Sequence, residues 1–168
     1  NKALQTAAND LCERQEEILT ANALDLENGK NSGMNPGLLD RLKLTGERIA
    51  QIAEGLRQIA DLPDCIGETM EHFERPNGLK IDKVRVPLGV IGIIYEARPN
   101  VTADAFGLCF KTGNAVILKG GSDAIHSNIA IVKVLQDALE DCGMPRTAVQ
   151  LIEDTDRAVT ARFMKMKE

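Results

Sequence analysis

Four consecutive residues, Lys119, Gly120, Gly121 and Ser122, are the clearest candidates for ligand binding in this chain. They stand where an apolar run ends and a long amphipathic pattern begins, which predicts the carboxyl end of a strand followed by a helix. Ligands of open parallel sheets bind at that edge, and the free amides of a helix start favour an anion. The glycines would let a ligand approach the backbone, while Lys119 would supply a mobile positive charge and Ser122 a hydroxyl group. The four residues therefore predict a site for a phosphate-bearing ligand.

The same residues also fit a plain turn between a strand and a helix, with Ser122 as the helix N-cap. Short glycine motifs are weakly specific, and the sequence contains neither a G-x-G-x-x-G fingerprint nor a P-loop. Residue types and spacing alone leave both interpretations open.

The second candidate is Asn100, in the segment 95–102 that follows another apolar run. Held by the preceding proline, its side-chain amide would point at an oxyanion that develops during a reaction, an interaction worth about 3–4 kcal/mol in comparable sites. On residue type alone, capping the next helix is the simpler role for Asn100. Glu96 and Arg98 fit either an ion pair at the sheet edge or two solvated loop charges, and we favour the second interpretation.

The elements that must position these candidates alternate between strand and helix from residue 88 onward. Apolar runs predict three strands, over residues 88–94, 115–118 and 148–152, and the first is expected to be buried on both faces. The helices predicted after them cover residues 100–113, 122–143 and 155–167, with Asn100 or Thr102 capping the first. This alternation predicts a parallel sheet with right-handed crossovers, one nucleotide-binding half of a doubly wound α/β fold.

The first third of the chain has the apolar periodicity of amphipathic helices. A first helix is expected over residues 3–28, before a clear break at residues 28–33. A second helix is expected to start at Asn35, which is followed by proline, and a third to run from Thr45 until Pro63 ends it. No residue in this part indicates chemistry, so we interpret it as packing surface.

Residues 66–73 and 79–86 alternate in polarity and flank the sequence Arg75-Pro76-Asn77-Gly78. Asn-Gly between alternating runs is a strong signal of a β-hairpin. A two-stranded excursion that leads into a buried strand is often an arm that pairs with another subunit, and we expect that role here.

Length and composition fit one globular domain or part of a larger one: the chain has 168 residues, of which 43% are hydrophobic and 27% charged. The net charge of −5 argues against nucleic acid as a partner. No stretch approaches the roughly 20 apolar residues of a membrane span, and no signal peptide is recognisable. We therefore expect a cytoplasmic protein without membrane contact, and, since the chain begins at Asn1, one that is trimmed at its front.

The four cysteines (Cys12, Cys65, Cys109 and Cys142) are widely spaced, and only two histidines accompany them. That spacing fits neither a zinc site nor a disulfide framework, so we expect no metal and four buried, inert thiols.

Four ordered blocks of sequence, at residues 75–79, 86–92, 95–102 and 117–124, resemble the γ-glutamyl phosphate reductases (glutamate-5-semialdehyde dehydrogenases). These enzymes are a branch of the aldehyde dehydrogenase superfamily, and the similarity extends over essentially the whole chain. The resemblance implies an incomplete aldehyde dehydrogenase-like cofactor domain with a Rossmann-like parallel sheet. Its parts would be a helical part (1–64), a β-hairpin oligomerisation arm (65–87) and a βαβαβα nucleotide-binding part (88–168).

The resemblance also implies roles for the candidate residues. Asn100 matches the superfamily's oxyanion asparagine, and Lys119 matches the lysine that contacts the adenosine ribose of the cofactor. Ser122 stands where many NAD-preferring relatives carry a glutamate that holds the ribose hydroxyls. A serine removes a carboxylate that would repel a 2′-phosphate, so the resemblance implies NADPH/NADP as the cofactor, bound by Lys119, Gly120, Gly121 and Ser122.

The implied reaction is the NADPH-dependent reduction of γ-glutamyl phosphate to glutamate-5-semialdehyde and phosphate in proline biosynthesis. The nucleophilic cysteine of this family is expected in a catalytic domain beyond residue 168, so the chain alone is expected to be inactive. The resemblance further implies a homo-oligomer, and it leaves open whether a glutamate 5-kinase is a partner or is fused to the parent protein. Two alternatives stay open: a non-catalytic nucleotide-binding or assembly module, and another acyl-phosphate or aldehyde dehydrogenase.

Overall fold

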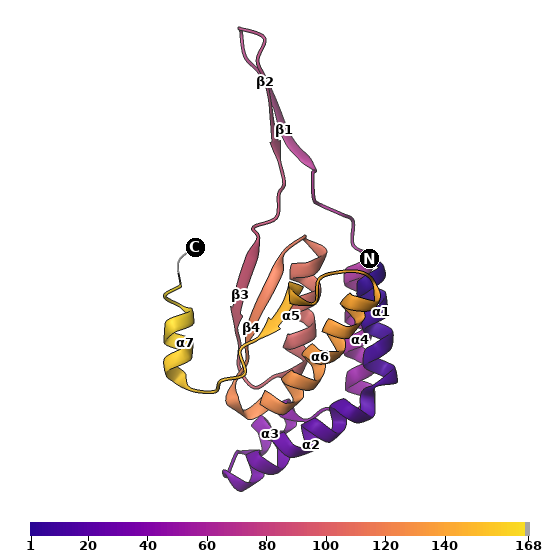
Figure 1. The fold of residues 1–168 in the computed structure, drawn as a ribbon, viewed down its shortest axis with the longest axis vertical. Helices are drawn as coiled ribbons and strands as arrows, with labels where there is room; N and C mark the ends of the chain where they lie inside the picture. Colours follow the sequence, from indigo (N-terminus) through magenta and orange to yellow (C-terminus); the bar gives the residue numbers. More distant parts are fainter. Residues whose placement is uncertain (167–168) are drawn as a thin grey trace.

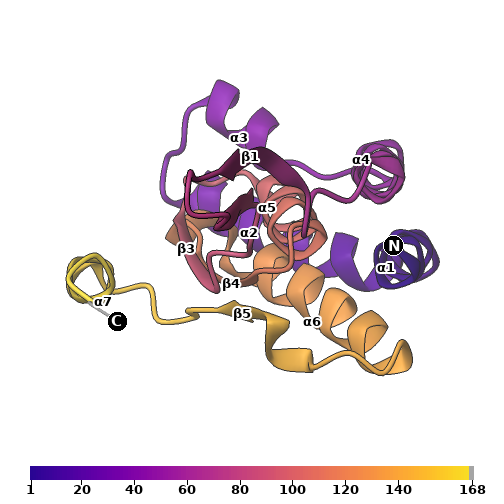
Figure 2. The same cartoon turned by 90° about the horizontal axis from the view of Figure 1, so that it is seen from above.

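The computed structural model describes residues 1–166. A body of helices packed on a small sheet carries a long hairpin that projects away from it, and the last helix lies on the opposite side of the sheet from the other helices (Figures 1 and 2). No helix in the described part of the chain combines the length and the apolar character that crossing a bilayer requires.

Two helices, α1 (Lys2–Glu13) and α2 (Gln15–Asn31), replace the single helix predicted for residues 3–28. The prediction was wrong because the apolar spacing continues across Arg14, whose backbone leaves the helical region at φ −100° and ψ 21°. The break lets α1 pack on α4 and α6 while α2 packs on α6 and α3. The predicted interruption at residues 28–33 was wrong for residues 28–31, which are still helical, and right for residues 32–33, because α2 ends at Asn31.

Helices α3 (Pro36–Leu42) and α4 (Gly46–Asp61) begin at the predicted positions, with Asn35 and Thr45 as their N-cap residues. The side chain of Asn35 accepts a hydrogen bond from the amide of Leu38 at 2.9 Å. The hydroxyl of Thr45 accepts one from the amide of Arg48 at 3.2 Å. Each cap satisfies an amide that has no partner inside its helix.

Strands β1 (Thr69–Glu74) and β2 (Lys80–Val84) form the predicted antiparallel hairpin. Gly78 closes the turn with a φ of 83°, and its amide donates to the carbonyl of Arg75 at 2.8 Å. Every residue of both strands is exposed, so the hairpin contributes nothing to the core of the body (Figure 1).

Strands β3 (Val90–Ile94), β4 (Ala115–Lys119) and β5 (Val149–Leu151) form a parallel sheet in the order β3-β4-β5. The crossover helices are α5 (Pro99–Lys111) and α6 (Ile125–Asp141). One short 3-10 turn (Ser122–Ala124) precedes α6, and another (Arg146–Ala148) follows it. Both crossover helices lie on the same side of the sheet, with α1, α2 and α4 packed outside them (Figure 2). The predicted α/β fold with a helical amino-terminal part and a parallel sheet is confirmed.

The expectation that β3 is buried on both faces was wrong. Val90 and Ile94 are 64% and 46% exposed, because the helices cover only one face of this edge strand. Helix α7 (Arg157–Phe163), shorter than the predicted 155–167, lies on the other side (Figure 2), and its Phe163 packs near Gly92. Residue 167 of that prediction lies outside the described residues. An apolar run shows only that burial of a strand would be favourable, and here the described residues bury little of β3.

Of the four cysteines, all of them free thiols, only Cys109 is buried. The expectation of four buried thiols was wrong for Cys12, Cys65 and Cys142, which are partly exposed. Burial raises the pKa of the Cys109 thiol, so this sulfur stays protonated and unreactive at neutral pH.

Candidate functional site

Asn100 lies in the first turn of α5, where Arg98 is the N-cap residue. The expectation that Asn100 or Thr102 caps this helix was therefore wrong, because the helix begins one residue before Asn100. The exposed side chain of Asn100 donates from Nδ2 to the carboxylate of Asp104 at 3.3 Å. This bond uses one of the two N–H groups of the amide, so the other can serve a ligand.

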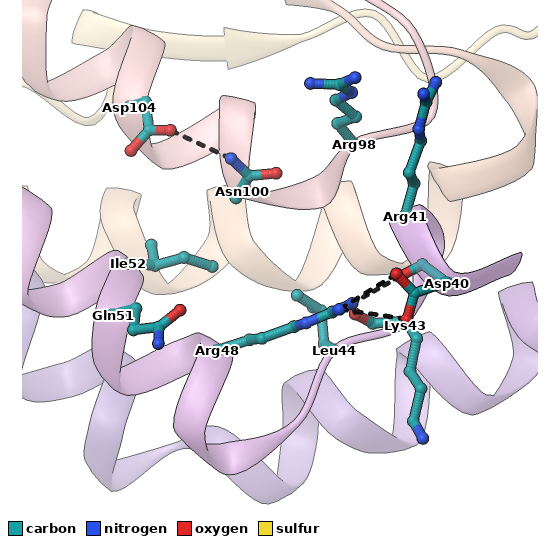
Figure 3. Close-up of a pocket in the computed structure, with 10 residues that line it drawn as sticks. All are labelled: Asp40, Arg41, Lys43, Leu44, Arg48, Gln51, Ile52, Arg98, Asn100 and Asp104. Atoms are coloured by element: carbon teal, nitrogen blue, oxygen red, sulfur yellow. Dashed lines mark hydrogen bonds and ion pairs between the residues drawn. The ribbon is translucent and has the colours of Figure 1, made fainter. Parts of the chain in front are cut away.

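A cavity of about 400 Å³ opens beside Asn100, between α3, α4 and the start of α5 (Figure 3). Most of its lining comes from the helical first third, which the sequence presented as packing surface. The charged side chains around it are Asp40, Arg41, Lys43, Arg48, Arg98 and Asp104. Sequence reasoning missed this site because charges around the α3–α4 connection look like an ordinary solvated surface until the fold brings α5 beside them.

The cations of the cavity differ in their partners. Arg48 is held in place by the carboxylate of Asp40 at 3.2 Å and by the carbonyl oxygen of Lys43 at 2.7 Å (Figure 3). Arg41 and Arg98 have no side-chain hydrogen bond or ion pair within residues 1–166. Glu96 is likewise not paired with Arg98 by its side chain, as expected of solvated loop charges.

Lys119 ends β4 and is only 4% exposed. Its ammonium donates to the carbonyl of Gly120 at 3.1 Å. The expected mobile charge is therefore wrong: the side chain is enclosed at the sheet edge. A buried ammonium with one protein partner keeps two N–H donors for a further acceptor.

Gly120 and Gly121 are required by packing within the chain. A Cβ atom at Gly120 would collide with the amide of Asn128 and approach Tyr95, and one at Gly121 would lie 3.1 Å from the backbone nitrogen of Ala97. Neither glycine has a positive φ. Their smallness lets the loop after β4 lie against the loop after β3.

The start of α6 is already occupied by an anion from the chain itself. The amides of His126 and Ser127 donate to the carboxylate of Asp25 at 3.1 and 2.8 Å. The expectation of free amides is wrong for these two groups. Ser122 is exposed and lies in a 3-10 turn before the helix, and its side chain does not cap α6.

A buried polar cluster joins the two candidate loops. The hydroxyl of Tyr95 lies 2.7 Å from that of Thr102, which donates to Asn128 at 2.8 Å. Burial raises the pKa of Tyr95 to about 12. The Nδ2 group of Asn128 has no partner among the described residues and lies directly beside Gly120. The residues around 95–102 and 119–122 thus meet at the carboxyl edge of the sheet.

These observations fit a nucleotide at that edge. Lys119 ends β4 and offers unfilled donors, and Ser122 follows the strand and offers an exposed hydroxyl, at the edge where ligands of parallel sheets bind. The fit does not extend to the first amides of α6, since Asp25 holds them.

Comparison with known proteins gives concordant matches. The model of the aldehyde dehydrogenase family matches residues 1–168. A gamma-glutamyl phosphate reductase of Heliobacterium modesticaldum is 59% identical over the whole chain, which covers 40% of that relative. The solved gamma-glutamyl phosphate reductase of Thermotoga maritima superposes with a TM-score of 0.96 at 42% identity, over 99% of this chain and 40% of that one.

The solved gamma-glutamyl phosphate reductase of Saccharomyces cerevisiae matches 92% of this chain and 40% of its own, with a TM-score of 0.84 and 32% identity. The chain thus spans about 40% of the length of the relatives it matches.

Proposed function

Because this chain belongs to the aldehyde dehydrogenase family, we propose that it supplies the cofactor-binding part of an NADPH-dependent γ-glutamyl phosphate reductase. The complete enzyme would reduce γ-glutamyl phosphate to glutamate-5-semialdehyde and release phosphate, a step of proline biosynthesis. The observation that carries the proposal is the similarity over the full chain to reductases of that name, one of them 59% identical. The position of Asn100 at the carboxyl edge of the sheet, beside a cavity, supports it.

Asn100 would act on the acyl group of the substrate. When a nucleophile attacks this group, negative charge develops on the acyl oxygen, and the free N–H of the Asn100 amide would donate to it. The contact with Asp104 restrains the amide so that little reorganisation is needed. We place the nucleophilic thiol outside these residues, because none of the four cysteines lines the cavity beside Asn100 and burial keeps the thiol of Cys109 protonated. We therefore expect the chain alone to have no reductase activity.

Lys119 and Ser122, with the backbone of Gly120 and Gly121, would hold the adenosine end of NADPH. When bound, the cofactor supplies the hydride for the reduction. A serine at position 122 leaves room for a 2′-phosphate and adds no carboxylate that would repel it. The unfilled donors of the buried Lys119 ammonium support its role with ribose or phosphate oxygens.

The hairpin would pair with a second copy of the enzyme. Its exposed apolar side chains include Met70, Phe73, Ile81 and Val84, and covering them in an oligomer would be favourable. We further propose a cytoplasmic enzyme, with glutamate 5-kinase as the source of the labile acyl phosphate.

The test is the phosphate-dependent reverse reaction of the complete enzyme. Oxidation of glutamate-5-semialdehyde with NADP should exceed that of uncharged aldehydes, and it should require inorganic phosphate. If the complete protein binds the nucleotide but catalyses no reaction, it is a non-catalytic binding module instead. Equal rates with unrelated aldehydes would contradict the assigned substrate.

A further inference from the structure

We propose that the cavity beside Asn100 binds an oxyanion group of the substrate, a carboxylate or a phosphate, through Arg41 and Arg98, an inference that rests on the proposed reductase function. It adds binding residues from the helical first third to a site that the sequence confined to residues 95–122.

The first argument is charge. The chain as a whole carries a net charge of −5, yet the cavity is lined by the basic residues Arg41, Lys43, Arg48 and Arg98 and only two acids, Asp40 and Asp104. The carboxylate of Asp40 is already paired with Arg48. The local excess of positive charge therefore belongs chiefly to side chains that have no acidic partner in the described residues.

The second argument is the contrast between guanidinium groups. Elsewhere, Arg14 is paired with Glu17 and Asp137, and Arg146 with Asp137 and Glu140, each within 2.8 Å. Arg41 on α3 and Arg98 in the loop before α5 have no such partner within residues 1–166. Arg75, Arg157 and Arg162 also lack one among the described residues, but none of these three lines the cavity. A guanidinium group binds carboxylate and phosphate through two parallel hydrogen bonds, so both free groups are suited to one anion.

The third argument is geometry. Figure 3 shows the side chain of Arg41 directed toward the loop that carries Arg98, with Asn100 on the same wall of the cavity. The amino end of α5 also faces the cavity, and the partial positive charge of a helix start favours an anion there. The volume of about 400 Å³ suits a small ligand. An anion held by these groups would lie beside the amide that we assign to the acyl oxygen.

The substrate has two such anions, and the reverse reaction separates them. In the reverse direction the α-carboxylate is part of the substrate glutamate-5-semialdehyde, whereas inorganic phosphate is a separate substrate. A variant that loses the carboxylate contact raises the KM for the aldehyde, and one that loses the phosphate contact raises the KM for phosphate.

The experiment compares Arg41→Gln and Arg98→Gln with Arg57→Gln in the complete enzyme. Arg57 lies on α4, outside the cavity lining, so its variant removes the same charge without touching the cavity. We expect each cavity variant to raise one of the two KM values by about ten-fold or more, with a smaller change in kcat. Oxidation of pentanal, which has no carboxylate, should distinguish loss of the carboxylate contact from a general loss of activity. Arg98→Lys should restore part of the affinity that Arg98→Gln loses.

Unchanged KM values for both anions in an active enzyme would overturn the inference and leave the proposed function standing. Titration of the complete enzyme with inorganic phosphate and with L-glutamate requires no turnover. Binding that is lost in the cavity variants but kept in Arg57→Gln would support the anion site even if the reductase assay failed. Binding that is equal in all variants would contradict it.

Discussion

The carboxylate of Asp25 on α2 accepts hydrogen bonds from both the amide and the hydroxyl of Ser127 in the first turn of α6, at 2.8 and 2.6 Å. A third bond, from the amide of His126, completes the cap. A buried acid more than a hundred residues away in sequence thus fills the end of the helix that follows the glycine loop.

Replacing Asp25 should destabilise the fold. We expect Asp25→Ala to lower the free energy of unfolding by about 2–3 kcal/mol, because it leaves buried donors without an acceptor and removes a helix cap. Urea unfolding measures this loss. Glu27→Ala, at an exposed position on the same helix, is the control and should change stability by less than about 0.5 kcal/mol. Equal stabilities for the two variants would show that α6 does not depend on this carboxylate.

Gly120 is expected to tolerate no side chain. Gly120→Ala should cost about 1–3 kcal/mol, since the new methyl group meets the buried Asn128 amide and the ring of Tyr95. Gly55→Ala is the matched control: it lies inside α4 with only ordinary contact at 3.7 Å. That change should stabilise the protein by about 0.5–1 kcal/mol through helix propensity. Thermal melting of the two variants should therefore shift in opposite directions.

Tyr95 provides a prediction for alkaline pH. Its pKa is raised by burial to about 12 in the folded chain, whereas an unfolded tyrosine titrates near about 10. The folded state therefore keeps its proton longer, and stability should fall as pH rises through the interval between these values. Tyr95 is the only tyrosine of the chain, so tyrosinate absorbance reports it directly. If the tyrosinate absorbance of the native protein had its midpoint at about pH 10, the prediction would be wrong. Tyr95→Phe should abolish the contribution of this tyrosine to the pH dependence of stability.

Asn100→Ala in the complete enzyme should lower kcat by about 10²–10³-fold and change substrate KM much less, because in the role we propose the amide acts on charge that develops during the reaction. Asn28→Ala, an exposed asparagine on α2, should leave kcat unchanged. A loss confined to KM would mean that Asn100 binds the substrate without stabilising the oxyanion.

Ser122→Glu should weaken NADPH binding by about ten-fold and NADH binding less, because in the proposed site the new carboxylate would repel the 2′-phosphate. Ser122→Ala is the comparison that removes the hydroxyl without adding charge. Lys119→Ala should weaken both nucleotides alike. Calorimetric titration measures the affinity of all three variants for each nucleotide. Equal losses of affinity for NADPH and NADH in Ser122→Glu would show that residue 122 does not lie beside the 2′-phosphate.

Sequence patterns predicted the elements well where local chemistry determines them. The helix starts at Asn35 and Thr45, the Asn-Gly turn and the alternation after residue 88 each depend on neighbours in the chain, and each was found. The break at Arg14 was missed because the apolar spacing of the sequence continues through it. The apolar faces of α1 and α2 both still point toward the core after the bend.

The candidate site was harder to predict, because its details come from distant contacts. The enclosure of Lys119, the capping of α6 by Asp25 and the arginines beside Asn100 all depend on helices that pack across the sheet edge. No local spacing contains that information. The glycines were recognised, but the need for them arises from Asn128 and Ala97 as well as from any ligand.

The exposed hairpin has a consequence for how this chain can vary over evolutionary time. Residues 69–84 place no side chain in the core of the body, so substitutions there leave the folding of the body untouched. In the proposed pairing with a second copy, selection acts on the arm through the surface that would cover it, whereas the glycine loop is constrained by its own neighbours. The two parts of one chain are therefore free to diverge at different rates.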